Sequence, residues 1–239
     1  MTGMRRPLVL LALIALACRG RSGAAAAEPE MATPAEHPDD HAAAAAEHAM
    51  AGMVMEDLHL RMTALRPPTP ADSARAAAVL AVMRRDLAQY KDIRVAQADG
   101  FREFIPAAGA PIHHLTKIRW AFESRNSFDP SHPTSLLYDR SLELVGAMFT
   151  APGQMSEDDL NARLPLSIAR WHQHINWCLP PFGQRERWRE MRNGAPVFGP
   201  KSPIATEAEC GAVGGRFRPR LFGWMVHVMA FAPGDPWKH

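Results

Sequence analysis

Residues Trp171 to Cys178, WHQHINWC, alternate between polar and apolar side chains at every position except Gln173. Such alternation predicts a β-strand, because successive side chains of a strand point to opposite faces. Two imidazoles that lie two residues apart on a strand can both reach one metal ion. One face of this strand would carry the polar members of the stretch: His172, His174, Asn176 and Cys178. The stretch therefore predicts a strand with a metal-binding face.

A second predicted strand, Leu221 to Phe231, carries another histidine near the end of the chain. His227 shares a face of this strand with Met225 and Met229. A third source is Ile112-His113-His114, where only one histidine can join a cluster because adjacent strand residues face oppositely. We therefore expect metal ligands from distant parts of the chain: His172, His174 and His227, with His114 as the fourth candidate.

Three histidines suit a copper or zinc ion, and on zinc they leave one coordination position open for water. A metal-dependent hydrolase is therefore an alternative to metal binding alone, although no carboxylate lies on the histidine face of the 171–178 strand. A third possibility is a non-catalytic envelope protein of unknown function, whose histidines are structural and bond to the backbone. The sequence contains no nucleophile elbow, phosphate loop or dinucleotide fingerprint, and it assigns no catalytic residue.

The first 17 residues have the three parts of an export signal. Two arginines form a basic start, Pro7 to Ala17 form an apolar run, and small residues precede Cys18. The run is shorter than the stretch of about 20 residues that spans a bilayer. The sequence Ala-Leu-Ala-Cys ending at Cys18 resembles the lipobox of bacterial lipoproteins, which implies lipidation of this cysteine. We expect a lipid-anchored protein on the periplasmic side or surface of the bacterial cell envelope, with simple secretion as the alternative.

The predicted location bears on the other two cysteines. With Cys18 assigned to the lipid, Cys178 and Cys210 remain as an even pair in an oxidising compartment. We expect them to form a disulfide, which would close a loop of roughly 30 residues. The alternative is that Cys178 is a thiolate metal ligand beside the histidines.

Residues 18–66 predict a disordered tether, because they are rich in alanine and show no sustained apolar periodicity. Their unusual content is histidine and methionine, and imidazole with thioether sulfur suits copper. The segment resembles the His/Met-rich leaders of bacterial extracytoplasmic copper-handling proteins. A secondary metal site in the tether would use His37, His41, His48, Met50, Met53 and Met55. The alternatives are a plain flexible spacer or a short helix over residues 53–65.

Residues 67–239 are expected to form a single α+β domain after a proline-rich linker. Thr69 would cap a helix that begins at Pro70 and continues to Tyr90. A second helical turn over residues 92–99 would end at Gly100. Both helices precede the predicted strands.

Short strands are expected beyond Gly100. Residues 134–138 and 142–150 flank Asp139-Arg140-Ser141, which indicates a hairpin. Thr206 and Glu209 have the spacing of a capping box that opens a short helix. Helices followed by antiparallel strands predict an α+β fold, in which N-terminal helices pack on a small antiparallel β-sheet.

The charge of the chain gives no reason to expect nucleic acid as a partner. The formal net charge is +2 at pH 7, and loss of Arg5 and Arg6 with the export signal brings it to about zero. The expected partners are a membrane, through the lipid anchor, and a metal ion. The sequence leaves a protein partner unknown.

Several short pieces of the domain carry a resemblance. They are residues 98–101, His113-His114, Asp129-Pro130, 133–139, 144–152 and the WHQHINWC stretch, and together they span roughly residues 90–231. In these pieces the chain resembles a group of bacterial exported proteins that have no assigned function. The resemblance implies a compact exported domain, but it implies no activity and adds no catalytic residue.

Overall fold

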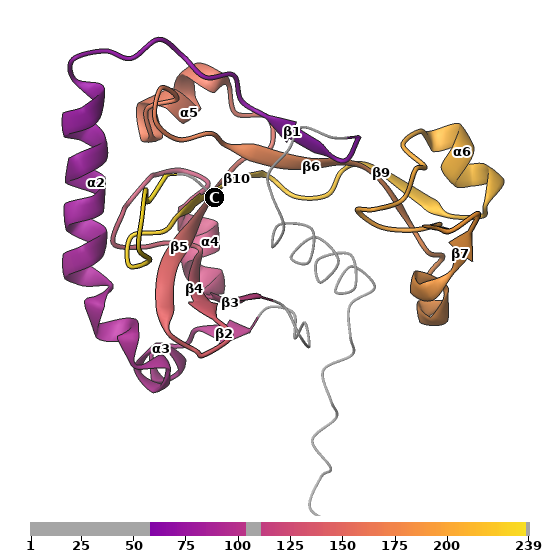
Figure 1. Cartoon of the computed structure of the whole chain (residues 1–239), viewed down its shortest axis with the longest axis horizontal. Helices are drawn as coiled ribbons and strands as arrows, with labels where there is room; N and C mark the ends of the chain where they lie inside the picture. The colour runs from indigo at the N-terminus through magenta and orange to yellow at the C-terminus, as the bar shows by residue number, and fades with distance from the viewer. Residues whose placement is uncertain (1–57, 104–110, 238–239) are drawn as a thin grey trace, which may run out of the picture. The chain divides into compact units, whose positions relative to one another are not determined.

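The computed structural model describes residues 58–103 and 111–237 of the chain (Figure 1). All of them belong to one compact unit, His37–His239. Several predictions lie outside the described residues: the export signal, the lipidation site Cys18, and the tether ligands His37, His41, His48, Met50, Met53 and Met55. Within the described ranges, no helix has the length and apolar content needed to cross a membrane.

An antiparallel sheet is the main element of the described residues (Figure 1). Seven of its strands run in the order β1-β6-β10-β5-β4-β3-β2, and β9 pairs with β6 as the eighth. The strands are β1 (Leu60–Met62), β2 (Arg102–Glu103), β3 (Ile112–Thr116), β4 (Ser135–Asp139), β5 (Leu144–Ala151), β6 (His172–Leu179), β9 (Arg216–Arg220) and β10 (Trp224–Val228). A separate two-stranded ribbon joins β7 (Met191–Arg192) to β8 (Ala195–Pro196). The combination of helices and antiparallel sheet confirms the α+β class, but the sheet is larger than predicted.

Short helices connect the strands. They are α2 (Asp72–Asp86), η1 (Ala88–Lys91), α3 (Ile93–Ala98), α4 (Ile118–Glu123), α5 (Glu157–Arg163), η2 (Arg185–Arg189) and α6 (Glu207–Ala212). The start of α2 differs from the prediction, because Ala71 occupies the N-cap without a side-chain bond. The Asp72 carboxylate instead accepts the amide of Thr69 at 2.9 Å and the hydroxyl of Ser167 at 2.8 Å. The carboxylate, not the threonine hydroxyl, organises this turn.

Two other local sequence motifs, a capping box and a hairpin turn, correctly predicted the elements that they begin or connect. Thr206 and Glu209 form the predicted capping box at the start of α6. The predicted hairpin is present as β4 and β5, and the Asp139 carboxylate accepts the amides of Ser141 and Glu143 in its turn. These motifs depend on residues within a few positions of one another, so their geometry follows from the local sequence.

One face of the sheet forms the main apolar core. Leu136, Tyr138 and Trp171 on this face are fully buried, and Met83 of α2 packs in the same cluster. Figure 1 shows α2 alongside the β4–β5 part of the sheet. Burying one such side chain stabilises the fold by about 1.5–3 kcal/mol. The core therefore covers one side of the sheet and leaves the other to a different set of side chains.

Residues 58–66 differ from the predicted tether, because they belong to the fold. Leu60–Met62 forms β1 and pairs antiparallel with β6. Beyond it, the Thr63 amide donates to the Trp171 carbonyl at 2.8 Å, and the Trp171 amide donates to the Thr63 hydroxyl at 3.0 Å. β1 supplies backbone partners to a strand edge that would otherwise lack them. Residues 60–62 are also a strand and not the end of a helix over 53–65.

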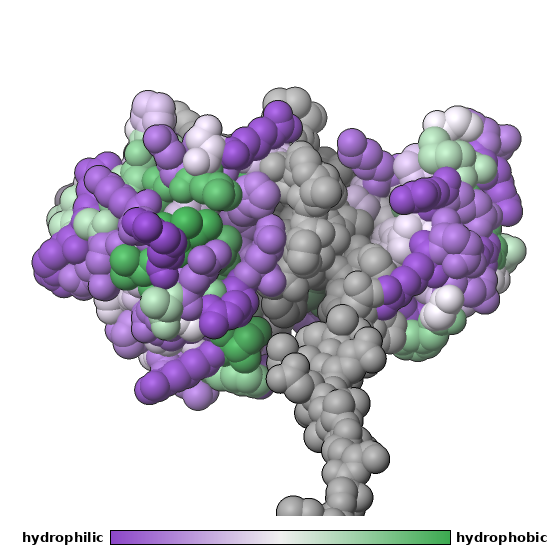
Figure 2. All heavy atoms as spheres, turned by 90° about the horizontal axis from the view of Figure 1, so that it is seen from below, coloured by the Kyte–Doolittle hydropathy of each residue, from purple (hydrophilic) through white to green (hydrophobic). Residues whose placement is uncertain are grey.

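The predicted disulfide is present between Cys178 on β6 and Cys210 on α6, and both residues are fully buried. A thiolate ligand at Cys178 is therefore a wrong alternative. The backbone of Gly215 lies so close that an added Cβ would collide with both sulfurs. We refer to η2, β7, β8, α6 and β9 as the disulfide lobe. Hydrophilic side chains cover most of this lobe on the face seen in Figure 2, where it lies on the right.

Candidate functional site

The second face of the sheet carries the predicted histidines. Strand register sets His172 opposite Met225 and His227 opposite Met148. Leu137, which lies opposite His114, packs in one cluster with these two methionines. Directly opposed residues of an antiparallel pair share a face. Four side chains from three parts of the sequence therefore face the same side of the sheet: His114, His172, His174 and His227.

These four imidazoles form a row, which we call the histidine row. The ring centroids lie 5.7 Å apart from His174 to His172, 5.3 Å from His172 to His227, and 5.5 Å from His227 to His114. None of the four residues is more than 6% exposed. Within residues 58–103 and 111–237, however, no group of three or more His, Cys, Asp or Glu side chains is arranged as a metal site.

Burial keeps two members of the histidine row neutral. Desolvation, with a smaller contribution from the nearby His113 and His59, respectively, lowers the pKa of His114 and of His174 to about 4. A neutral imidazole has a nitrogen lone pair available to bind a metal ion. In addition, the buried Nε2 of His174 has no hydrogen-bond partner among the described residues. An unsatisfied buried polar atom costs about 1–3 kcal/mol, so its retention points to a role outside folding.

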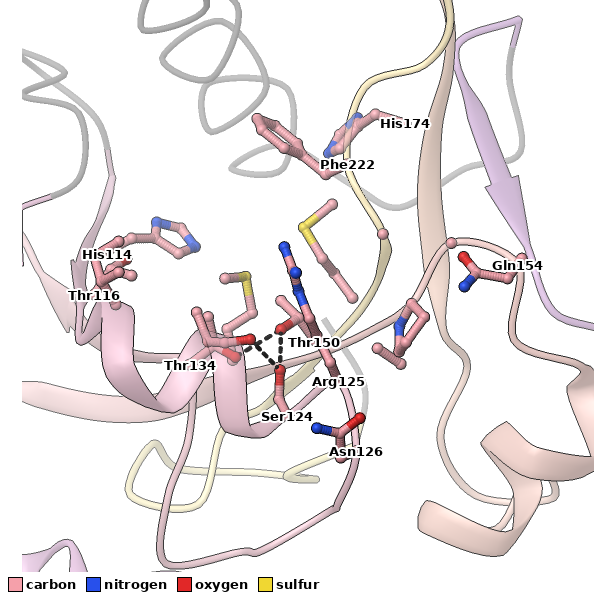
Figure 3. A pocket seen from close by; sticks show the side chains of 18 residues that line it. His114, Thr116, Ser124, Arg125, Asn126, Thr134, Thr150, Gln154, His174 and Phe222 are labelled. Carbon is pink, nitrogen blue, oxygen red and sulfur yellow. Dashed lines mark hydrogen bonds between the residues drawn. The ribbon is translucent and has the colours of Figure 1, made fainter.

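A cavity of about 620 Å³ opens on the same face (Figure 3). His114 and His174 line it together with apolar side chains that include Met148 and Met225. A second part of its wall is a group of linked hydroxyls, in which Thr150 Oγ1 lies 2.9 Å from Ser124 Oγ and 2.7 Å from Thr134 Oγ1. The described lining residues include no carboxylate. The cavity is thus bounded by imidazoles, thioethers and hydroxyls.

The alternation that predicts β6 breaks at Asn176. This residue adopts a left-handed conformation with φ of 57°, and its side-chain amide donates to the Leu58 carbonyl at 3.1 Å. From Ile175 onward β6 pairs with β9 instead of β1 and β10. After this change Trp177 lies against His174, with ring centroids 5.4 Å apart, and Cys178 enters the disulfide. Asn176 and Cys178 therefore do not continue the histidine row.

His113 has the orientation expected of a strand neighbour of His114. Its Nδ1 lies 2.9 Å from a carboxylate oxygen of Glu103, on the adjacent strand β2. Only His114 of the pair lines the cavity. The prediction that a single member of this dipeptide could join the cluster agrees with the structure.

Sequence reasoning missed the other polar residues of the cavity. They lie on β3 and β5, directly after α4 and directly before β4, and they include Thr116, Ser124, Arg125, Asn126, Thr134 and Thr150. Helix α4 itself was not predicted, and its C-cap Ser124 brings the hydroxyl group to β5. Thr134 and Thr150 lie at the ends of predicted strands, but no sequence pattern there distinguishes them from their neighbours.

Comparisons with known proteins leave the site to be interpreted from its geometry. No protein-family model, curated protein or solved structure matches this chain. The resemblance to an exported group of proteins accordingly stays a prediction.

Proposed function

We propose that this chain is a lipid-anchored metal-binding protein of the bacterial cell envelope, with copper or zinc held by the histidine row. The main support is the convergence of four buried imidazoles from three parts of the sequence on one face of the sheet. A face needed only for packing would carry apolar side chains, because burying polar groups costs free energy unless they are satisfied.

The donor chemistry supports these metals over harder cations. Imidazole nitrogen suits both zinc and copper, and the thioethers of Met148 and Met225 beside the row favour the cuprous ion. Calcium and magnesium prefer oxygen ligands, including carboxylates, and the described cavity lining has no carboxylate. Since no three donors are arranged around one point in the described residues, the proposal requires rings of the row to turn when an ion binds.

The roles of the individual residues follow from their positions. His172 would be the central ligand, because its ring contacts those of both His174 and His227. His174 would offer its unpartnered Nε2, and His114 would be the fourth ligand. Cys18 would anchor the chain, and the His/Met-rich tether would collect ions near the row.

The cavity favours a second candidate function, a metal-dependent hydrolase. An ion on the histidine row would lie next to a space large enough for a small substrate. Such a reaction also needs a general base, and no described lining residue is a carboxylate. Metal binding without turnover therefore stands as the main proposal.

Metal stoichiometry tests the proposal directly. The purified chain is dialysed against cuprous or zinc ions and its metal content is measured by elemental analysis. The double variant His172→Ala/His174→Ala is expected to lose one equivalent of metal. His113→Ala is the matched control, because this neighbouring histidine pairs with Glu103 away from the row. Full stoichiometry in the double variant would refute the proposal.

The tether needs a separate arm of the same experiment, because its histidines and methionines can bind ions on their own. A variant with alanine at positions 37, 41, 48, 50, 53 and 55 is expected to keep the equivalent that depends on His172 and His174. Loss of all metal from this variant would show that the metal site lies in the tether and not on the sheet.

A further inference from the structure

Arg125 brings a positive charge to the cavity beside the histidine row. It directly follows Ser124, the C-cap of α4, and in Figure 3 its guanidinium extends from the helix end into the cavity. It is the one charged side chain among the described lining residues, since those histidines are neutral at pH 7. Its described contact is the Phe122 ring, 4.8 Å from the guanidinium carbon. A guanidinium in a concave site without a carboxylate favours an anion.

Neighbouring polar groups can add to the binding of such an anion. The side chain of Asn126 follows Arg125 in the lining, and the linked hydroxyls of Ser124, Thr134 and Thr150 lie on the same part of the wall (Figure 3). An amide side chain donates hydrogen bonds to anionic oxygens, whereas the three hydroxyl protons are already used, because Ser124 donates to the Ala121 carbonyl and the hydroxyls bond to one another. The cavity therefore has a cationic end with an uncharged amide donor beside it.

The rest of the wall suits an apolar body. Met148, Met225 and Phe222 line the cavity, and methionine adapts to ligands of irregular shape. A volume of about 620 Å³ lies within the range of pockets that enclose small organic molecules. A second observation points to a ligand here: the imidazole of His174 is 1% exposed, lines the cavity and has an Nε2 that no group in the described part of the chain hydrogen-bonds.

We propose that this cavity binds a small organic anion, with its acidic group at Arg125 and its apolar body against the methionines. Recognition of this kind needs no metal. An ion on the histidine row would strengthen the attraction by adding positive charge. The inference goes beyond the proposed function, because it assigns a ligand class and a binding residue outside the row.

Two fluorescent probes of nearly the same shape test the proposal on the full chain. 1-Anilinonaphthalene-8-sulfonate carries an anionic group on an apolar body, and N-phenyl-1-naphthylamine has the same body without the charge. Both are titrated in the presence of a chelator, so that failure of the metal proposal does not affect the result. We expect saturable binding of the anionic probe, weakened about tenfold by Arg125→Gln, the size typical of a lost charge-assisted hydrogen bond. Affinity for the neutral probe should stay the same.

Arg119→Gln is the matched control for Arg125→Gln. Arg119 lies on α4, carries the same charge and is exposed like Arg125, but it pairs with Glu123 and does not line the cavity. Equal urea midpoints of both variants would show that the fold is intact. The proposal is overturned if the native chain does not bind the anionic probe, if Arg125→Gln leaves its affinity unchanged, or if Arg119→Gln weakens it equally.

Discussion

On β4, Leu136 and Leu137 point to opposite faces of one sheet, and their neighbours differ in kind. Leu136 belongs to a core of more than twenty buried apolar residues, whereas Leu137 shares its buried cluster with two methionines. Both leucines are at most 1% exposed. Burial is thus similar on the two faces, but one is filled with apolar side chains and the other holds the histidine row and a cavity. A buried face that is only partly apolar indicates selection for something other than stability.

Acid should separate the two faces most strongly, because the buried imidazoles lie on the histidine face. The unfolded chain binds protons at His114 and His174 below a pKa of about 6.5, but the native protein does so only below about 4. The unfolding free energy of the metal-free protein should therefore fall as the pH drops from 6.5 to 4, by on the order of 3 kcal/mol for each histidine. Urea titrations across this range measure it. A flat profile would mean that these rings are not buried as neutral groups.

Shortening the two leucines of β4 should show the next largest effect. Leu136→Ala leaves a cavity in the large core and is expected to cost about 4 kcal/mol. Leu137→Ala should cost only about 2 kcal/mol, because fewer buried apolar groups surround it and an open cavity lies nearby. Urea denaturation of both variants gives the difference, and equal losses would contradict the distinction between the faces.

The disulfide offers a test that separates stability from metal binding. Replacing Cys178 and Cys210 by alanine removes a link across 32 residues and should cost about 3–4 kcal/mol by the chain-entropy argument. Metal uptake by the histidine row should persist under conditions in which the variant remains folded. Loss of uptake from a folded variant would mean that the row depends on the disulfide lobe.

The smallest expected effect is a gain, and not a loss, in the free energy of unfolding. His174→Leu exchanges a buried imidazole with an unpartnered Nε2 for an apolar group of similar size. The metal-free variant should therefore be about 1 kcal/mol more stable than the native chain, while its metal binding weakens. His113→Leu, which loses the contact to Glu103, should bring no such gain. A clear loss of stability in His174→Leu would mean that this imidazole stabilises the fold and that the histidine face has a structural role.

Local sequence signals predicted those features that local geometry decides. The β4–β5 hairpin, the capping box of α6 and the pairing of Cys178 with Cys210 all follow from spacing or residue count. The shared orientation of His172 and His174 also follows from strand periodicity. Bringing His227 and His114 to the same row required the correct strand neighbours, which were inferred only as a possibility.

The missed features depend on tertiary structure. β1 is only three residues long and depends on its pairing with β6. β9 alternates arginine with Phe217 and Pro219, but a proline inside such a short run argues against a strand, and the segment is held by its pairing with β6. The break at Asn176 arises where β6 changes partners, while its sequence continues to alternate. Arg125 and the hydroxyls of the cavity come from separate elements, so no spacing rule links them.

The packing around Cys178 and Cys210 has a kinetic consequence. Neither sulfur is accessible, and the main chain of Gly215 closes one approach to them. A small thiol reductant in solution can attack only after the surrounding segment detaches transiently. The rate at which the disulfide of the native protein is reduced would thus report how often that end of β6 opens. Ligands that hold the strand in place would slow the reduction.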